Sequence, residues 1–414
     1  MMSKEDTTRT FLWEESTAHS SHDPLDCFLG DSSEVSEELS ASERSQSDEE
    51  KYAKAGCYIK DRMKTILASE TFCKLRESKE GLKKNEPVTR VNHSQIELGN
   101  LLGGGAFSNV FEIKTSLTNE IDPNTCVVKV LRKHVLDRTK LFTACAVGLL
   151  REGSILASLQ HEHIIGVQAF SQVGPSGYAT GRNDACFLVL DKLQEILSTR
   201  MDTWTKFQVS MFDRKRSKKN REFFCERLNV AQQLASAITY LHQKSIVHRD
   251  IKPNNIGFDA GGMIKLFDFD VSRIIPEEEY ANQVFKLTKT GTKRYMSPEC
   301  GLGEKYNLKT DVYSFAILLH QILSLVVPYC DLNMFEVKRK VMQHGLRPKI
   351  PMSWPKGIKQ LLKQAWCTDI SERLDMSTVH DNLQQELYKL QNYQGAKLLG
   401  KTLTAPTTKL ALRV

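Results

Sequence analysis

Two short stretches of apolar residues predict the first strands of the chain. Residues 96–98 alternate apolar and polar side chains, and 110–113 carry three apolar residues, a pattern typical of half-buried strands. Three glycines, 103–105, lie between the two stretches, so we expect a hairpin with a glycine-rich turn. A third strand is expected at 127–130, where Lys129 has apolar neighbours on both sides.

Helical spacing of apolar residues appears further along the chain. Residues 149–156, continued by Leu159, follow a helical pattern. A second helix is expected around 230–242, and a long apolar helix begins at Asp311. The apolar run 316–327 is interrupted by His320 and Gln321 and is shorter than the roughly 20 residues that cross a bilayer. It therefore predicts a core helix and no membrane span.

Charge divides the chain into an acidic opening and a basic remainder. Residues 1–50 contain 14 Asp and Glu against three Lys and Arg, a net charge of −11, while the whole chain of 414 residues carries +7 and the remainder therefore +18. The acidic, serine-rich opening has too little apolar surface to fold, so we predict a disordered tail over 1–86. A solubilising role is its plainest interpretation; phosphorylation, or folding back onto the basic remainder, are the alternatives.

The other compositional features concern partners and location. The basic remainder could favour acidic partners, but no aromatic residues interleave with the charges as on a nucleic-acid surface, so no nucleic acid is expected. Ten cysteines are scattered without a C-x-x-C pair, which argues against a zinc ribbon and for reduced thiols in an intracellular protein. No N-terminal apolar stretch is typical of a signal peptide. We expect a cytoplasmic protein.

The octapeptide 248–255, His-Arg-Asp-Ile-Lys-Pro-Asn-Asn, carries the candidate chemistry. Asp250 and Asn255 are five residues apart, and Asp268 opens an Asp-Phe-Asp triplet 18 residues after Asp250. That spacing resembles the catalytic loop and the metal-binding segment of the protein kinases, enzymes of phosphoryl transfer in which positioned charge does most of the catalysis. We expect Asp250 to accept the proton of an incoming hydroxyl and Lys252 to neutralise charge on the phosphate, while Asn255 and Asp268 hold two Mg²⁺.

The features upstream fit the same chemistry. A glycine-rich hairpin can fold closely over a triphosphate and offer N–H groups to it. Lys129 is expected to reach the α- and β-phosphates, and an ion pair with Glu152 on the 149–156 helix would fix it. The same resemblance implies that the nucleotide is contacted by Leu102, Gly103, Gly104, Gly105, Ala106, Phe107, Ser108, Asn109, Val110, Lys129 and the hinge-like Asp191 and Leu193.

These motifs, in this order, resemble the eukaryotic protein kinases over residues 95–388. Lys252 and the pair 291–292 are similar to the serine/threonine type, and 311–319 with 366–367 to its tyrosine-kinase-like group. The resemblance implies an α+β, bilobal fold that uses ATP and Mg²⁺ on protein substrates. Its boundaries would be a small β-rich N-lobe at 95–190, a helical C-lobe at 191–388 with a basic insertion at about 198–224, and a C-terminal tail at 389–414.

The chain departs from the family pattern at two positions near the site. Asp270 replaces the glycine of Asp-Phe-Gly; aspartate tolerates a left-handed backbone better than most residues, so we expect an active geometry with reduced switching. Ser297 replaces the usual alanine before the buried Glu299, whose expected partner is Arg373. Because Lys129 and both key aspartates are present, an active serine/threonine kinase is favoured over the alternative, a pseudokinase scaffold that binds partners without catalysis.

Regulation adds two further hypotheses. The insertion contains six basic residues in eight at 214–221, which we interpret as a solvated loop, with a nuclear-import signal or an anion-binding patch as the alternative. By resemblance, Arg249 would hold a phosphate added by an upstream activating kinase to Thr288 or Thr290. The Thr292 hydroxyl is expected to bond near Asp250 instead.

Overall fold

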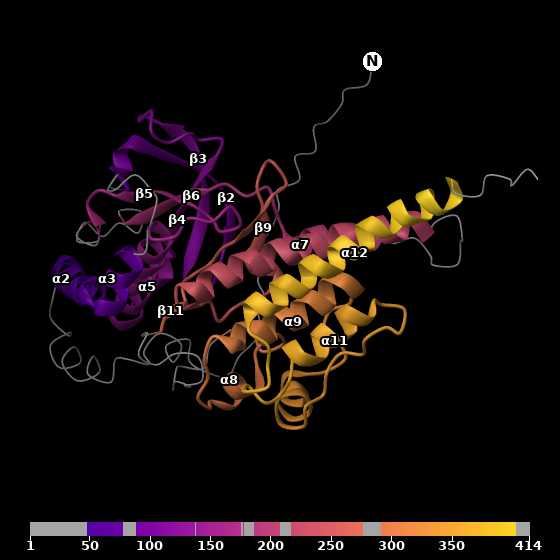
Figure 1. Ribbon diagram of the computed structural model, residues 1–414. Helices are drawn as coiled ribbons and strands as arrows, with labels where there is room; N and C mark the ends of the chain where they lie inside the picture. The colour runs from indigo at the N-terminus through magenta and orange to yellow at the C-terminus, as the bar shows by residue number, and fades with distance from the viewer. Residues whose placement is uncertain are drawn as a thin grey trace, which may run out of the picture.

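The computed structural model describes residues 48–77, 88–136, 138–174, 177, 186–207, 217–275 and 291–402. A β-rich N-terminal lobe is followed by a larger, mostly helical C-terminal lobe (Figure 1). The α+β bilobal class predicted from the sequence is therefore confirmed.

A six-stranded sheet forms the N-terminal lobe. Its strands, in spatial order, are β1 (Thr89–Val91), β5 (Val167–Ser171), β6 (Phe187–Asp191), β4 (Cys126–Leu131), β3 (Ser108–Ser116) and β2 (Ile96–Gly104). All neighbours are antiparallel except β1 and β5. The two predicted hairpin strands are present but longer than expected. Because β1 adds to the edge at β5, the lobe begins before residue 95, the predicted boundary.

Helix α5 (Thr139–Ala157) packs on this sheet, after the short helix α4 (Lys133–Leu136). Gly153 permits the close approach, because a Cβ there would lie 2.5 Å from Phe170 Cε1 and 2.7 Å from Leu188 Cδ2. The helix covers the predicted 149–156 stretch and ends before Leu159. It carries Glu152 toward β4, which carries Lys129.

Two helices precede the sheet where the sequence predicted disorder. Helices α2 (Asp48–Ala68) and α3 (Glu70–Glu77) are formed, so the predicted disordered tail over 1–86 is wrong for 48–77. The physical reason is a stripe of apolar residues with helical spacing, Ala55, Ile59 and Met63, that is buried against the core. The charge count covered residues 1–50 only, and its extension to residue 86 overlooked that stripe.

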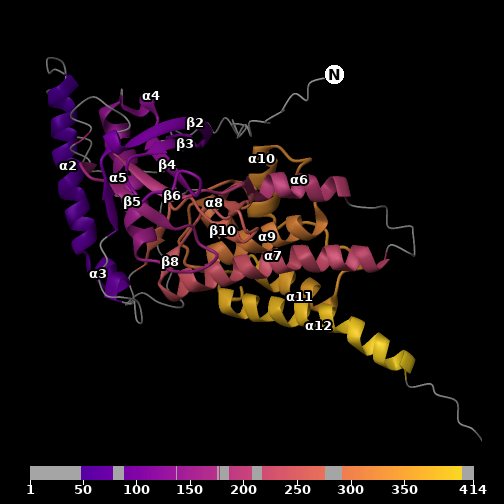
Figure 2. The same cartoon turned by 90° about the horizontal axis from the view of Figure 1, so that it is seen from above.

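The C-terminal lobe is built from helices around α9 (Lys309–Ser324), which is buried from Thr310 to Leu323. Helix α7 (Ser217–Gln243) packs against α9 and α12 (Figures 1 and 2). The others are α6 (Leu197–Phe207), α8 (Pro298–Leu302), α10 (Met334–Glu336), a π-helix η7 (Val337–Gln343), α11 (Lys356–Ala365) and α12 (Met376–Thr402). Two small sheets complete the lobe: a three-stranded one of β7 (Glu195–Ile196), β9 (Ile256–Phe258) and β10 (Ile264–Leu266), and a two-stranded one of β8 (Ile246–Val247) and β11 (Arg273–Ile274).

Two predicted boundaries in this lobe need correction. The helix expected around 230–242 begins at Ser217, so α6 and the start of α7 occupy much of the predicted insertion at 198–224. The part of the basic cluster from Ser217 onward is helical rather than a loop; its first three residues lie outside the described ranges. At the other end, α12 continues past residue 388 to Thr402, so the predicted boundary between the domain and its C-terminal tail falls inside this helix.

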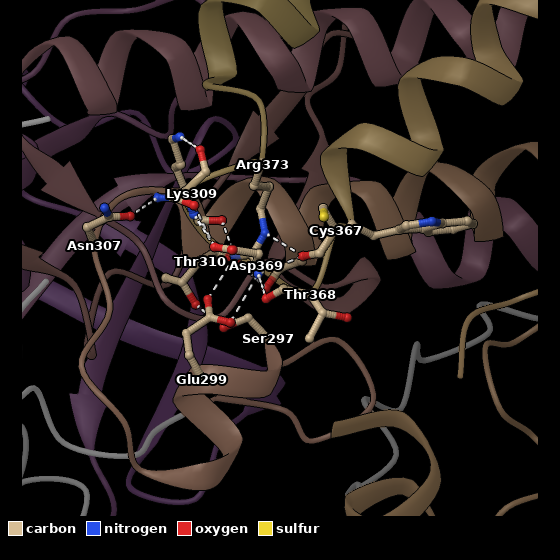
Figure 3. Close-up of polar contacts among 12 residues, drawn as sticks. Ser297, Glu299, Asn307, Lys309, Thr310, Cys367, Thr368, Asp369 and Arg373 are labelled. Atoms are coloured by element: carbon tan, nitrogen blue, oxygen red, sulfur yellow. Dashed lines mark hydrogen bonds and ion pairs between the residues drawn. The ribbon is translucent and has the colours of Figure 1, made fainter. Parts of the chain in front are cut away.

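Arg373 and Glu299 form the buried pair expected from the sequence (Figure 3). Arg373 Nη1 donates to Glu299 Oε1 at 2.7 Å and Nη2 to Oε2 at 3.0 Å, a bidentate geometry that gives both charges partners. Ser297 is accommodated by a 2.6 Å hydrogen bond between its hydroxyl and that of Thr310. The pair fixes α8 against the segment that precedes α12.

Candidate active site

Lys129 is the buried cation of the cleft. Every residue of β4 is buried, and the ammonium of Lys129 lies 2.7 Å from Glu152 Oε2 on α5. The ion pair expected from the sequence is therefore present. Glu152 Oε1 also accepts a hydrogen bond from the Phe269 N–H at 3.2 Å. The carboxylate thus joins β4, α5 and the Asp-Phe-Asp segment.

Two more carboxylates surround the same ammonium. Asp268 Oδ1 lies 3.2 Å from Lys129 Nζ and Asp270 Oδ1 lies 3.1 Å from it. The sequence did not reveal the contact of Asp270, although its place two residues after Asp268 was a signal that both could reach one cation. One positive charge thus faces three carboxyl groups.

The surplus of negative charge shifts the pKa values of the cluster. Burial raises the pKa of Glu152, and the nearby charge of Asp270 raises it further, against the attraction of Lys129. Burial disfavours a charged Lys129, but Asp270, Glu152 and Asp268 together raise its pKa well above the usual value. For Asp268, the charges of Lys129 and Lys252 outweigh burial and lower its pKa. These shifts favour a charged Lys129, and they make Glu152 more readily protonated than Asp268.

The backbone of the Asp-Phe-Asp segment differs from the expectation. Asp268 is in the left-handed region with φ of 67°, whereas Asp270 does not belong to the described residues with positive φ. We expected Asp270 to replace the glycine by adopting a left-handed backbone, and this expectation is wrong. Phe269 is buried and its ring meets His248 edge-on at 4.9 Å, which holds the segment in its inward position.

Asp250 lies at the centre of the catalytic loop. Its Oδ2 is 2.7 Å from Lys252 Nζ and accepts a hydrogen bond from Asn255 Nδ2 at 2.9 Å. Burial opposes the charge of Lys252, but the Asp250 carboxylate raises the pKa of that lysine. On the other side, Asp250 Oδ1 accepts bonds from the Thr292 hydroxyl at 2.9 Å and its N–H at 3.0 Å, as expected for Thr292.

Asp311 holds the catalytic loop in place, a role that sequence reasoning missed. It lies on the first turn of α9, fully buried, and its two oxygens accept the backbone N–H groups of His248 and Arg249 at 2.8 Å each. Arg249 has φ of 71°, a left-handed conformation that needs such support. A carboxylate at the start of an otherwise apolar helix was the available signal.

The glycine-rich turn joins β2 and β3 in a hairpin. Gly103 pairs with Val110 and Gly104 with Asn109 across β2 and β3, and the Gly105 N–H donates to Ser108 O at 2.9 Å. A Cβ on Gly104 would lie 2.6 Å from Asn109 Oδ1, whereas one on Gly105 would meet nothing within 4 Å. Of the remaining predicted residues, Ser108 is buried, Leu102, Phe107 and Val110 are partly buried against the core, and Ala106 is exposed.

The hinge residues differ in what their side chains contact. The Asp191 carboxylate accepts the Gly166 N–H at 2.7 Å and so is directed at the N-terminal lobe. Leu193 packs against β9, where a Cβ on Gly257 would lie 2.6 Å from its Cδ1. The backbone of Asp191 therefore remains a candidate for nucleotide contact, and the Leu193 side chain, predicted to contact the nucleotide as well, borders the large lobe.

Arg249 already has partners in the described structure. Its guanidinium donates to the carbonyl of Val271 and, at 3.2 Å, to the Tyr306 hydroxyl. Thr288 and Thr290, the predicted phosphorylation sites, lie outside the described residues. The expected phosphate clamp stays a prediction, and a phosphate would have to compete with these two partners.

The oxygen-rich donor set fits a divalent cation such as Mg²⁺. Asn255 uses its amide nitrogen on Asp250, at 2.8 Å from the carbonyl and 2.9 Å from Oδ2, which leaves the amide oxygen as its group for a cation. The Asp268 side chain is 36% exposed, and carboxylate and amide oxygens are the ligands that Mg²⁺ prefers. Glu152, Asp268 and Asp270 each offer an oxygen within 4.8 Å of the others. The charge surplus of this cluster would favour a bound cation.

Comparison with known proteins defines the family. Residues 96–383 match the model of the protein tyrosine and serine/threonine kinase family, which covers more than half of the chain. The chain therefore belongs to this family, and the serine/threonine type and tyrosine-kinase-like resemblance predicted from the sequence are confirmed.

Several curated serine/threonine-protein kinases are similar to it. STY46 and STY17 of Arabidopsis thaliana are each 34% identical, over 156 and 158 residues, which is 38% of this chain and 26% and 27% of theirs. CBL-interacting serine/threonine-protein kinase 20 of the same plant is 25% identical over 294 residues, 70% of this chain and 58% of that one. The chain thus matches less than two thirds of the length of these relatives. Within the described residues, no helix combines the length and apolarity needed to cross a membrane.

Proposed function

We propose that this protein is an active serine/threonine kinase that transfers the γ-phosphate of ATP to hydroxyls of protein substrates. The observation that carries the proposal is the arrangement around Asp250. One carboxylate oxygen contacts Lys252 and Asn255, and the other contacts Thr292. An acidic group oriented by a lysine and an amide is suited to receive a hydroxyl proton while the lysine neutralises charge on the phosphate.

Each charged residue has a distinct task in this proposal. Lys129, held by Glu152, would bind the α- and β-phosphates, and the turn 103–105 would cover the triphosphate with backbone N–H groups. Asp268 and Asn255 would hold Mg²⁺, which neutralises the charge of the phosphates when bound. Burial of Phe269 and the support from Asp311 keep these groups in place without rearrangement.

The supporting observations favour serine and threonine as acceptors. Lys252 occupies the place beside Asp250 where, by family resemblance, tyrosine kinases carry other residues. Thr292 closes the opposite side of the same carboxylate. A peptide-array profile of the purified protein would measure which residues around the acceptor hydroxyl the kinase prefers.

Replacement of Asp250 by asparagine tests this function. Incubation of the full chain with labelled ATP, Mg²⁺ and a basic protein should show phosphate transfer, and Asp250→Asn should lower kcat by about 10²- to 10⁴-fold. ATP affinity should stay within a few fold, because Asp250 orients the acceptor and not the nucleotide. Asp259→Asn, at a carboxylate in the β9–β10 turn, is the matched control. Unchanged turnover in Asp250→Asn would remove this residue from the mechanism.

We further propose a cytoplasmic kinase activated by an upstream kinase at Thr288 or Thr290. The nine cysteines that the structure describes are free thiols, which supports a reducing compartment. Entry into the nucleus through 214–221 is the alternative location. Mass spectrometry of active protein, paired with Thr288→Ala and Thr290→Ala, tests the activation step. Full activity of unmodified protein would exclude it.

A further inference from the structure

Helix α5 is buried around nearly its whole circumference. Its residues Cys145 to Gly148 are four consecutive buried positions, which sweep about 300° around an α-helix. A helix with an apolar stripe on one side needs one neighbour, but a helix that is apolar all round needs cover on every side. The sheet supplies only part of that cover, at Gly153.

Helix α2 supplies the other part. It packs against α5, and its stripe of Ala55, Ile59 and Met63 is between 0% and 7% exposed. At the start of α5, the ring of Tyr52 meets the ring of Phe142 edge-on, with centroids 5.8 Å apart. Figure 2 shows α2 along the outer side of the N-terminal lobe, with α5 between it and strand β5. The N-terminal extension is thus part of the lobe's core.

The same helix α5 carries the residue that organises the cleft. Glu152 is 1% exposed, holds Lys129 at 2.7 Å and accepts the N–H of Phe269 at 3.2 Å. Because Glu152 reaches both groups from one helix, a shift of α5 moves it away from both at once. The ammonium would then remain with Asp268 and Asp270 alone.

We propose that α2 is a positioning element of the active site, which sets the place of Glu152 by covering α5. This inference rests on the proposed kinase function. Docking of α2 favours the position of α5 seen here, and undocking would expose Phe142 and its apolar neighbours to water. Because that exposure costs free energy, docked α2 keeps α5 in the position that forms the Lys129–Glu152 ion pair. A substitution that undocks α2 should therefore lower kcat.

A charge placed in the α2 stripe tests the proposal in the full chain. Ile59→Asp puts a carboxylate at a fully buried position, and Ala53→Asp puts the same group on the exposed side of the same helix. We expect Ile59→Asp to lower kcat by up to about 100-fold, the loss that a displacement of roughly 1 Å can cause, and Ala53→Asp to leave it unchanged. Turnover is measured per folded molecule, below the melting transition of each variant.

A cycle with Glu152→Gln separates positioning from mere stabilisation. If α2 acts through Glu152, Glu152→Gln should lower kcat much less in the Ile59→Asp background than in the protein that keeps Ile59, because the ion pair is already lost. A purely structural α2 would lower the melting temperature of Ile59→Asp but leave kcat and the full effect of Glu152→Gln intact. That result would overturn the proposal. Should Ile59→Asp not fold, Ile59→Ala and Tyr52→Ala take its place in the cycle.

Amide hydrogen exchange tests the coupling without any activity. In Ile59→Asp, the segment containing the Phe269 N–H should exchange at least about tenfold faster, and α5 should lose protection with it. If the protein without substitutions transfers no phosphate even when its activation-segment threonines are phosphorylated, the proposed function is refuted, and the exchange result still decides this inference. Unchanged exchange at both segments would refute it.

Discussion

Two buried cation–carboxylate sites among the described residues, Arg373 with Glu299 in the C-terminal lobe and Lys129 with its carboxylates between the lobes, are built on opposite principles. In the C-terminal lobe, Arg373 faces one carboxylate, Glu299, through two bonds of 2.7 and 3.0 Å. Its remaining donors reach the carbonyls of Cys367 and Lys309 (Figure 3). All five N–H groups have acceptors and the charges balance, so nothing further can bind.

In the cleft between the lobes, Lys129 faces three carboxyl groups and the charges do not balance. The pair with Glu152 is buried, but Asp268 and Asp270 are 36% and 24% exposed at their side chains. A negative surplus that reaches solvent favours added cations, whereas a balanced and closed pair favours a single packing arrangement. In this protein, the site with balanced charges is structural, and the site with a negative surplus is the candidate active site.

Removal of Arg373 should have the largest effect on folding. Arg373→Met leaves Glu299 as an unpaired buried charge, which should lower the free energy of unfolding by about 3–5 kcal/mol. Urea denaturation followed by circular dichroism measures the loss, with the exposed Arg339→Met as control. A loss below about 1 kcal/mol, equal to that of the control, would remove the structural half of the comparison.

Removal of Lys129 should act mainly on catalysis. Lys129→Met should lower kcat/KM by about 100- to 1,000-fold, since a preorganised positive group at the phosphates is lost. The loss of folding stability should be smaller than for Arg373→Met, because two of the three carboxylates left behind reach solvent and Glu152, with its raised pKa, can take up a proton. Steady-state kinetics and urea denaturation on one preparation test both parts; a stability loss larger than that of Arg373→Met would reverse the comparison.

Glu152→Gln should lower activity less than Lys129→Met. The two residues act as one unit, so the double mutant should be hardly worse than Lys129→Met alone. The measurement is kcat/KM for the four members of the cycle. Full additivity of the two losses would mean that the 2.7 Å ion pair does not contribute to turnover.

Asp270 should have the smallest effect. Asp270→Gly removes one competitor for Lys129 and should preserve activity or raise it by a few fold, and it should improve the binding of inhibitors that need the outward state of Phe269. Asp270→Asn keeps the shape without the charge and separates these causes. The opposing hypothesis, that Asp270 is an essential metal ligand, predicts that both variants lose activity.

Sequence spacing was a good guide wherever function needs particular residue types at fixed intervals. The positions of Lys129, Asp250 and Asp268 could be placed in one cleft because each stands in a local motif of few residues. Glu152 could be predicted as the partner of Lys129 because it lies on a helical stretch between the Lys129 strand and the octapeptide 248–255. Spacing failed for Asp270, whose bond to Lys129 depends on the backbone angles of three consecutive residues rather than on their identity.

The sequence by itself determined the family, the two-lobe class and the residue types at the cleft. Local motifs and apolar periodicity depend only on residues that are close together in the chain, so they can be recognised without the tertiary structure. Only the tertiary structure decided what lies between distant segments: the docking of α2 on α5, the support of His248 by Asp311 and the third carboxylate at Lys129. Each of these contacts joins residues more than 60 positions apart, and the energy of such a contact depends on burial and geometry that a single segment does not contain.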